Sequence, residues 1–256
     1  MLNIVLPMAG RGSRFSEAGY TLPKPLIPVH GVPMIKVVVD NLAPKRAHRF
    51  IFVAQQAHID QYDLRSKLKS YAKNAEIIGI NKMTEGQVCT ALLAKEFFNN
   101  DEALLSANSD QYIDFDINEY LEAIDNYDLD GMIMTMKSRD PKWSYAKTDE
   151  WGIVIETAEK KVISPDAAVG IFSFKRGADL VRGAEQMIQD NVRVNGEFYT
   201  CPVYNYLIKE GKKIGIYSIG EEYNGMYGLG IPKDLDFFLQ HPVSRKIKQK
   251  KEGVIT

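Results

Sequence analysis

Two glycines and two cations near the N-terminus are the residues of this sequence best suited to chemistry. Gly10 and Gly12 stand in a loop directly after an apolar run, and Arg14 and Lys24 follow them. Glycine lets the main chain turn sharply and lets a ligand approach it closely. Successive backbone N–H groups in such a loop form a concave site for an anion. Together with two cations they favour a polyphosphate ligand, and a tight turn with ordinary surface charges is the alternative interpretation.

The prolines around Lys24 favour the functional interpretation. Pro23 and Pro25 flank this lysine, and their fixed φ angles preset its direction, which a solvated lysine does not need. The loop is not a P-loop, because no Gly-Lys-Ser/Thr follows the glycines. It is not a dinucleotide-binding fingerprint either, because Phe15 stands where the third glycine belongs.

Composition and charge limit the classes of protein to which the chain can belong. Its 256 residues are 45% hydrophobic and 25% charged, with a net charge of −1. This is typical of a soluble globular protein and argues against a general nucleic-acid binder, which needs a basic face. Cys89 and Cys201 have neither a disulfide framework nor metal-ligand spacing, which fits a reducing cytoplasm. We expect no signal peptide and no membrane span, because the chain begins with a strand and no apolar run is long enough to cross a bilayer.

Apolar strands alternate with amphipathic helices along the chain. Strands are expected at 4–6, 49–54, 76–80, 103–107, 131–137, 169–174 and 213–218, and helices at 34–42, 59–73, 88–98, 117–126, 177–190, 202–210 and 234–240. This order predicts an α/β fold with three layers, α/β/α, around a mostly parallel, Rossmann-like sheet. Short extended pieces between 145 and 163 predict a small antiparallel insertion. Trp143 and Trp151 flank it and are expected to pack it rather than to shape a binding pocket.

Three motifs follow one another in the first 35 residues. They are Gly-x-Gly-x-Arg at 10–14, Pro-Lys-Pro-Leu at 23–26 and Gly-x-Pro-Met at 31–34. In this order they resemble the signature of the sugar-phosphate nucleotidyltransferases, the pyrophosphorylases that make nucleotide sugars, in their bacterial capsule-type branch. The resemblance extends over nearly the whole chain. It implies a GT-A-type sheet and an enzyme that joins a nucleoside triphosphate to a phosphorylated acceptor.

The reaction that this resemblance implies is attack by a phosphate oxygen of the acceptor on the α-phosphorus of the triphosphate, with pyrophosphate leaving. The protein must align two polyanions and neutralise their charge. The main-chain N–H groups of 10–13 and Arg14 would hold the leaving phosphates, and by resemblance Lys24 sits at the α-phosphate. Asp110 follows the strand at 103–107, where ligands of open sheets bind, and is the expected ligand of Mg²⁺; a loop or capping aspartate is the alternative. Arg14, Lys24 and Asp110 are thus the expected catalytic residues.

The nucleotide is expected to contact three segments of the first half. By resemblance, Thr84-Glu85-Gly86-Gln87 is the turn that contacts the base, since Gly86 permits close approach and Gln87 offers an amide. A capping box formed by Thr84 and Gln87 is compatible with that role. The expected nucleotide-binding residues are Met8, Ala9, Gly10, Gly12, Ser13, Arg14, Lys24, Glu85, Gly86, Gln87 and Ser109.

The resemblance places the acceptor in the second half. Glu159-Lys160 matches a Glu-Lys pair whose lysine binds the acceptor's phosphate, and the adjacent Lys161 leaves the register open by one residue. Gly152 matches the glycine of an acceptor-binding Tyr/Phe-Gly-Val, and the segment 195–199 matches one that meets the sugar. The expected acceptor-binding residues are Gly152, Glu159, Lys160, Glu197 and Tyr199.

One departure from the family concerns the metal. The family usually carries a second metal-binding aspartate in Trp-x-Asp-x-Gly-x-Pro, and Gly228 stands at its position, ahead of Gly230 and Pro232. Glu221 and Glu222 are the expected substitutes. A site with one carboxylate, completed by phosphates and water, is equally allowed.

No Pro-, Gly- or Ser-rich linker divides the chain. The expected organisation is a single domain, 1–256, with a nucleotide-binding half at 1–138, an acceptor-binding half at 139–240 and a basic tail at 241–256. The basic run at 245–251 is expected to be a frayed, solvated end, with an anchor for an anionic surface as the alternative.

The function expected first is synthesis of a nucleotide sugar from a sugar 1-phosphate, in the cytoplasm, for capsule or other surface polysaccharide. A cytidylyltransferase acting on a non-sugar molecule, phosphocholine-like or a phospho-amino acid, is the main alternative. A GT-A-type glycosyltransferase usually carries Asp-x-Asp, whereas Asp110 stands in Asn-Ser-Asp. A catalytically silent nucleotide sensor has no need of Lys24 at the α-phosphate. The sequence identifies neither the base nor the oligomeric state, and a homo-oligomer is compatible with the resemblance.

Overall fold

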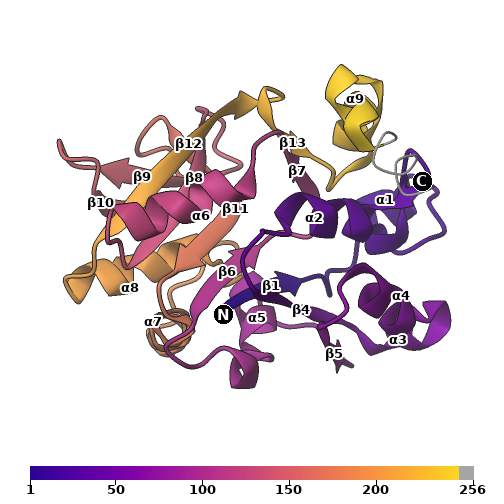
Figure 1. The fold of residues 1–256 in the computed structure, drawn as a ribbon, viewed down its shortest axis with the longest axis horizontal. Coiled ribbons are helices and arrows are strands. Elements are labelled where there is room, and N and C mark those ends of the chain that lie inside the picture. The colour runs from indigo at the N-terminus through magenta and orange to yellow at the C-terminus, as the bar shows by residue number, and fades with distance from the viewer. Residues whose placement is uncertain (248–256) are drawn as a thin grey trace.

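The computed structural model describes residues 1–247, and its centre is an 11-stranded mixed sheet (Figure 1). The main path of the sheet has the order β5-β4-β1-β6-β11-β8-β12-β13-β7, and β9 and β10 pair beside it. The strands are β1 (Leu2–Pro7), β4 (His48–Gln55), β5 (Glu76–Ile80), β6 (Ala103–Ala107), β7 (Gln111–Ile113), β8 (Gly131–Lys137), β9 (Ser144–Thr148), β10 (Val154–Glu159), β11 (Asp166–Phe174), β12 (Ile214–Glu222) and β13 (Gly225–Gly228). β2 (Pro28–Val29) and β3 (Val32–Pro33) form a separate antiparallel ribbon.

Strand direction bears out the mostly parallel sheet. β1 runs parallel to both β4 and β6, and β8 runs parallel to β12. On the main path only β11 and β7 run against their neighbours. β9 and β10 form the expected antiparallel insertion.

Helices cover both faces of the sheet, which gives the three expected layers (Figure 1). α2 (Met34–Leu42), α4 (Leu64–Tyr71) and α6 (Ile117–Asn126) contribute to the core on one face. α5 (Gln87–Leu92), α7 (Gly177–Gln189) and α8 (Tyr204–Lys209) contribute to the core on the other. β1 serves both cores, because successive side chains of a strand point to opposite faces: Ile4 and Leu6 lie in the first core and Val5 in the second. Within residues 1–247, no helix is long and apolar enough to cross a bilayer.

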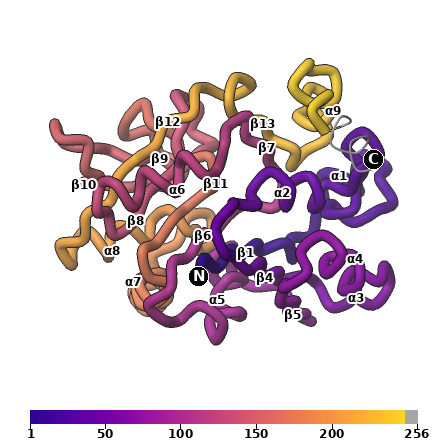
Figure 2. Tube along the Cα trace, viewed as in Figure 1, coloured from indigo at the N-terminus to yellow at the C-terminus, as the bar shows by residue number. Residues whose placement is uncertain are grey.

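The C-terminal helix α9 (Pro232–Gln240) packs on the N-terminal part of the chain. Leu235 and Phe238 of α9 share a third core with Met34 and with Phe15 of α1 (Ser13–Glu17). In Figure 2 the yellow helix α9 accordingly lies near the indigo segment around α1. This packing places the segment before α9 beside the glycine loop after β1.

Two of the expected helices are interrupted. The prediction of one helix at 59–73 is wrong, because α3 (Gln56–Tyr62) and α4 are separated by Asp63, whose φ of +48° is left-handed and does not continue an α-helix. The helix expected at 88–98 ends at Leu92 and is followed by a short 3-10 turn at Lys95–Phe97.

Part of the basic tail is packed rather than solvated. A 3-10 turn, Pro242–Ser244, follows α9. Ile247 is buried in the third core, and Lys246 donates a hydrogen bond to Asp114. A frayed end is therefore wrong for 245–247, and the rest of the predicted tail, 248–256, lies outside the described residues.

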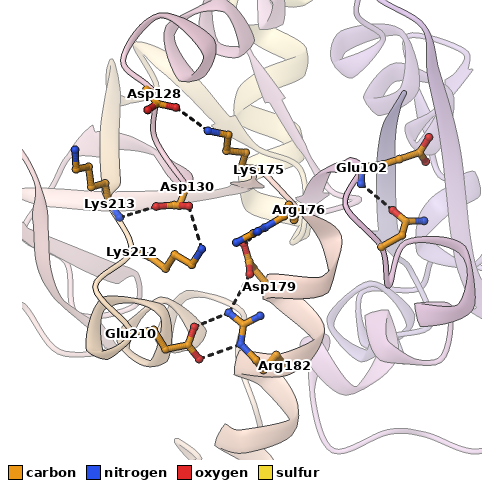
Figure 3. A network of polar contacts seen from close by, with 11 residues as sticks. Glu102, Asp128, Asp130, Lys175, Arg176, Asp179, Arg182, Glu210, Lys212 and Lys213 are labelled. Atoms are coloured by element: carbon orange, nitrogen blue, oxygen red, sulfur yellow. Dashed lines mark hydrogen bonds and ion pairs between the residues drawn. The ribbon is translucent and has the colours of Figure 1, made fainter.

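An ion-pair network fixes the loops at the edge of the sheet where β8 and β12 begin (Figure 3). Asp130, just before β8, accepts hydrogen bonds from Lys212 Nζ at 3.2 Å and from the main-chain N–H of Lys213 at 3.0 Å. Lys175, just after β11, bonds Asp128 at 2.6 Å. The pair of Lys175 and Asp128 is exposed to solvent and therefore contributes little to stability. The whole network lies at the edge of the sheet away from the carboxyl ends of β1 and β6.

Candidate active site

The carboxyl ends of two neighbouring strands position the central pair of polar side chains. β1 and β6 pair in parallel, so the loops that follow them leave the sheet at the same edge, where ligands of open α/β sheets bind. Asp110, from the loop after β6, lies 2.7 Å from Lys24, measured from Oδ2 to Nζ. The two side chains are 25% and 20% exposed. The structure thus brings together two of the three expected catalytic side chains.

The glycine loop after β1 is held from behind by a residue that the sequence did not indicate. Gln55, at the end of β4, donates from Nε2 to the carbonyls of Ala9 and Gly10 at 3.0 and 3.1 Å. Gly12 has a left-handed φ of +65° and caps α1. A Cβ at Gly12 would lie 3.4 Å from Cβ of Lys24, so the loop packs directly on the lysine.

The prolines around Lys24 define a short turn. Lys24 opens a 3-10 turn, Lys24–Leu26, after an extended Pro23. The N–H of Leu26 donates to the carbonyl of Pro23 at 2.8 Å. Pro25, inside this turn, is buried. The backbone on both sides of Lys24 is thus constrained, which fixes the point from which its side chain reaches Asp110.

Two cavities adjoin this pair, and a third shares wall residues with both of them. The turn cavity, about 380 Å³, lies between Pro7–Gly10, the segment 83–87 and Asp110. The loop cavity, about 540 Å³, lies between the start of α1, Asp110 and the segment 226–234. The hairpin cavity, about 200 Å³, lies beside Ser144 of β9 and Glu159 of β10.

The cavities share wall residues and therefore form one continuous site. Lys24 and Asp110 line both the turn and the loop cavities. Lys142 and Lys160 line both the hairpin and the loop cavities. Asn108 lines all three. A ligand in one cavity thus meets a ligand in the next at Asn108 and its neighbours.

The turn before α5 is pinned against the second half of the chain. A Cβ at Gly86, whose φ is +129°, would lie 2.4 Å from the carbonyl oxygen of Phe198, so only glycine fits there. Gly86 itself is the N-cap of α5, and no side chain caps this helix. The capping box expected from Thr84 and Gln87 is therefore wrong. Gln87 instead donates from Nε2 to the side-chain oxygen of Asn108.

Most of the expected nucleotide-binding residues line the site. Those on the turn cavity are Met8, Ala9, Gly10, Lys24, Gly86, Gln87 and Ser109. Those on the loop cavity are Gly12, Ser13 and Arg14, besides Lys24. Glu85 lines none of the three cavities; its side chain is 66% exposed and lies 3.1 Å from the guanidinium of Arg193.

The expected Glu-Lys pair lies in the wall of the hairpin cavity. Burial raises the pKa of Glu159, and Ser144 donates a hydrogen bond to its carboxylate. Lys160 Nζ donates to the hydroxyl of Tyr199 at 2.6 Å and stands 4.7 Å from the centre of that ring. Burial also raises the pKa of Tyr199, and the carboxylate of Glu197 adds to the effect. The neighbouring Lys161 is exposed, which favours the register with Lys160.

Two expected acceptor-binding residues lie elsewhere. Glu197 lines the turn cavity rather than the hairpin cavity. Gly152 lines none of the three cavities: it has a φ of +82° in the turn between β9 and β10, and a Cβ there would have no neighbour within 4 Å. Its glycine is accounted for by that turn.

The structure also brings in residues that the sequence did not single out, among them Asn108, Lys142 and Asp234. Trp143, expected only to pack the insertion, lines both the hairpin and the loop cavities as well as contacting the first core. The order Asn108-Ser109-Asp110 at a strand end was a usable signal for Asn108. No comparable signal marks Lys142 or Asp234, which reach the site only through the packing of β9 and α9.

Carboxylates other than the two expected glutamates lie beside Gly228. Glu222 lies 2.7 Å from Lys142 Nζ, and neither Glu221 nor Glu222 lines the three cavities. Asp234, the third residue of α9, does line the loop cavity, and a Cβ at Gly228 would lie 3.1 Å from its Oδ2. A Cβ at Gly230 would lie 2.4 Å from Oδ2 of Asp110, so that glycine leaves room for the first carboxylate.

The loop cavity offers a donor set suited to a hard cation. Asp110 and Asp234 place two carboxylates on its wall, and Mg²⁺ prefers carboxylate, phosphate and water oxygens. Within residues 1–247 there is no group of three or more His, Cys, Asp or Glu side chains that could hold a metal. The residues therefore fit a cation that is shared with a phosphate ligand rather than one held by protein alone.

Comparisons with known proteins identify the family of the chain. A sequence model of a family described as "Nucleotidyl transferase" matches residues 3–195. The "Bifunctional protein GlmU" of Methanocaldococcus jannaschii is 22% identical over 259 residues, covering 98% of this chain and 57% of that protein. The chain thus spans little more than half the length of this curated relative.

Solved structures give the same fold. A nucleoside-diphosphate-sugar pyrophosphorylase from Vibrio cholerae RC9 superposes with a TM-score of 0.79 and 26% identity, over 93% of this chain and 100% of that one. A UDP-glucose pyrophosphorylase from Acinetobacter baumannii superposes with a TM-score of 0.69 and 16% identity, over 99% of each chain.

Proposed function

The chain belongs to the nucleotidyl transferase family, and we propose that it transfers a nucleotidyl group from a nucleoside triphosphate to a phosphorylated acceptor, a sugar 1-phosphate being expected first. As a nucleotidyltransferase it would release pyrophosphate. One observation carries the proposal: the Lys24–Asp110 pair, with 2.7 Å between Nζ and Oδ2, stands where the turn and loop cavities join. A cation and a carboxylate at such a junction suit the reacting phosphate of a ligand that extends into both cavities.

The order of wall residues supports one direction for the triphosphate. The base lies against the turn around Gly86 and Gln87 in the turn cavity. The leaving phosphates lie in the loop cavity, against the glycine loop and Arg14. Because Lys24 lines both cavities, its ammonium falls between base and leaving group, at the α-phosphate. This supports the role that the resemblance implied for it.

The acceptor is proposed to occupy the hairpin cavity. Lys160 lines this cavity and the loop cavity, so its ammonium can hold the acceptor's phosphate close to the triphosphate. The carboxylate of Glu159, on the same wall, is a hydrogen-bond acceptor for a hydroxyl-bearing ligand. The acceptor's phosphate already carries the attacking oxygen as an anion. Catalysis then consists of aligning the two phosphates and stabilising the charge of the transition state.

Asp110 and Asp234 are the proposed ligands of a magnesium ion. When bound, Mg²⁺ would neutralise phosphate charge and orient the triphosphate. Asp110 meanwhile holds Lys24 in place through its Oδ2. Glu222 lines none of the three cavities, whereas Asp234 lines the loop cavity, and this favours Asp234 as the second carboxylate.

The wider assignments are proposals of the same kind. A nucleotide-activated sugar is consumed by enzymes that build polysaccharides, so we propose a supply role for capsule or other surface polymers, in the cytoplasm where triphosphates are made. We keep the proposal of a single domain, in which residues 1–138 bind the nucleotide and 139–240 the acceptor. The contact between Gly86 and Phe198 supports it, because it joins the two halves at the site.

The test is pyrophosphate release with Mg²⁺ across a matrix of substrates. It pairs each of the common nucleoside triphosphates with sugar 1-phosphates, phosphocholine and phospho-amino acids. We expect release with one base and one acceptor class. A non-sugar acceptor would establish the cytidylyltransferase-like alternative, and no release from any pair would refute the proposal.

A further inference from the structure

Two buried N–H donors at the active site have no acceptor within residues 1–247. They are Gln111 Nε2 and Trp143 Nε1, and both residues line the loop cavity. Leaving a buried donor without a partner costs about 1–3 kcal/mol, and such atoms in a native protein call for an explanation. The other buried side-chain atoms without a partner are hydroxyl groups within the sheet, in strands β6, β8 and β11: Ser106, Thr135 and Ser173.

Lys142 brings a cation to the same place. It lines the hairpin and the loop cavities together with Lys160, and its Nζ stands 4.9 Å from the centre of the Trp143 ring. Burial opposes its charge, but the hydrogen bond and charge of Glu222, with those of Asp140, outweigh burial and raise the pKa of Lys142. An ammonium has three N–H donors, so two carboxylates leave one for a ligand.

The ammonium groups of Lys142 and Lys160 favour an anion at the boundary between the hairpin and loop cavities. The ammonium of Lys142 stands 4.9 Å from the centre of the Trp143 ring, and that of Lys160 donates a hydrogen bond to the hydroxyl of Tyr199 at 2.6 Å. Both ammonium groups would repel a cationic ligand placed between them.

We propose that Lys142, Trp143 and Gln111 form, together with Lys160, the site that binds the phosphate group of the acceptor. Lys142, Trp143 and Lys160 line the boundary between the hairpin and loop cavities, which is where the acceptor's phosphate must meet the triphosphate. The identity of this anion rests on the proposed function, whereas the presence of an anion site does not. Lys142 and Trp143 therefore extend the acceptor-binding wall beyond the Glu-Lys pair.

Trp143 supplies a direct reporter of binding. The chain has two tryptophans, and Trp151 is 78% exposed in the turn between β9 and β10. In a Trp151→Phe background, Trp143 is the sole source of tryptophan emission. Titration with inorganic phosphate should shift that emission in a saturable way.

Variants in this background locate the phosphate. Lys142→Ala should weaken phosphate binding at least about tenfold, which corresponds to about 1.4 kcal/mol. Gln111→Leu removes the amide with little change in volume and should weaken binding at least about threefold, since one hydrogen bond to a charged group is lost. Lys175→Ala is the matched control. The side chain of Lys175 is 52% exposed, against 46% for Lys142, and each lysine is paired with a carboxylate. Lys175 lies at the opposite edge of the sheet. Its binding midpoint should stay within about twofold of the parent, given the screening of distant exposed charges.

Three outcomes would overturn the inference. The first is that phosphate causes no saturable change in tryptophan emission, and the second is that Lys142→Ala leaves the phosphate-binding midpoint unchanged. The third is that Arg14→Ala weakens phosphate binding as much as Lys142→Ala does, which would put the phosphate in the glycine loop. Once an acceptor is known, Lys142→Ala should raise its KM at least about tenfold and leave the KM of the triphosphate within about twofold. If the substrate matrix fails while Trp143 still reports phosphate, the proposed function is refuted and the anion site stands.

Discussion

Replacement of Lys24 by alanine separates a catalytic role from a structural one. In the structure Lys24 does two things: it bonds Asp110 at 2.7 Å, and its ammonium faces the junction of the turn and loop cavities. If the ammonium stabilises the transferring α-phosphate, Lys24→Ala should lower kcat strongly. If it serves only to hold Asp110, stability should suffer as much as turnover.

The magnitudes of the two effects differ enough to be told apart. A preorganised donor aimed at developing charge is worth about 2.7–4 kcal/mol, or about 10²–10³ in kcat. The Lys24 side chain is 20% exposed, so its charge is only partly screened by water, and the full range applies. Asp110 is 25% exposed, so water reaches it after the lysine is removed, and we expect the free energy of unfolding to fall by no more than about 1 kcal/mol.

The assay is steady-state pyrophosphate release combined with urea denaturation. Lys24→Ala should lower kcat about 10²–10³-fold while the KM of the triphosphate changes little. Lys36→Ala is the matched control, because Lys36 also bonds an aspartate, Asp40, at 2.7 Å but lies on α2 and lines none of the three cavities. Its kcat should stay within about twofold of the parent.

A double-mutant cycle tests the pairing of Lys24 with Asp110. Because the side chains are in contact, the losses of Lys24→Ala and Asp110→Asn should not add, and the double variant should be little worse than the poorer single one. The reasoning would be refuted by a kcat for Lys24→Ala within about fivefold of the parent, or by fully additive losses.

Three further predictions concern the turn, the metal and a buried acid. Gly86→Ala places a Cβ 2.4 Å from the carbonyl oxygen of Phe198. It should therefore raise the KM of the triphosphate and lower the free energy of unfolding by about 1–3 kcal/mol. An unchanged urea denaturation curve would contradict the close approach. Asp234→Asn should raise the Mg²⁺ concentration for half-maximal activity at least about threefold. Asp236→Asn is the control, because Asp236 lies on the exposed side of the same helix, and it should leave that concentration unchanged. Equal effects of the two variants would remove Asp234 from the metal site. Burial raises the pKa of Glu159 above its ordinary 4.5, so the native state binds its proton more tightly than the unfolded state does. The contribution of this carboxyl group to stability is complete below pH 4.5 and is lost as the pH rises through the raised pKa. The melting temperature of Glu159→Gln should therefore rise relative to that of the parent between about pH 4 and pH 8. A difference in melting temperature that does not change with pH would argue against the buried acid.

The placement of the residues proposed to bind phosphate could be predicted because its determinants are local. Gly12 and Pro23 fix backbone angles within a few residues of the groups they position. Asp110 was predictable from its place after an apolar strand, since the parallel order of β1 and β6 is a general property of such folds. The three layers followed from periodicity in the same way, and family membership agrees with them.

The acceptor side could not be read to the same depth, because its walls come from packing between distant segments. Lys142 reaches the site through the antiparallel insertion, and its direction is set by Glu222 at the end of β12. Gly152 shows the converse: its surroundings in sequence matched an acceptor-binding motif, but its positive φ serves a hairpin turn. A short motif thus gives the residue types, and only the pairing of β9 with β10 decides which of them face the cavity.

The missing carboxylate at Gly228 has a physical counterpart in Asp234, which comes from the next helix and lies beside Gly228 in space. α9 begins with Pro232, which starts a helix without needing an N–H donor there, and its third residue, Asp234, points back toward β13. A side chain at 228 would compete for this space, since a Cβ there would already lie 3.1 Å from the Asp234 carboxylate. Glycine at 228 and aspartate at 234 therefore belong together, and Gly228→Asp should not restore a site but should crowd two carboxylates, lowering both stability and the affinity for Mg²⁺. Recovery of stability or Mg²⁺ affinity in Gly228→Asp/Asp234→Gly, measured by urea denaturation and Mg²⁺ titration, would establish that the two positions exchange one function, and failure of both to recover would refute it.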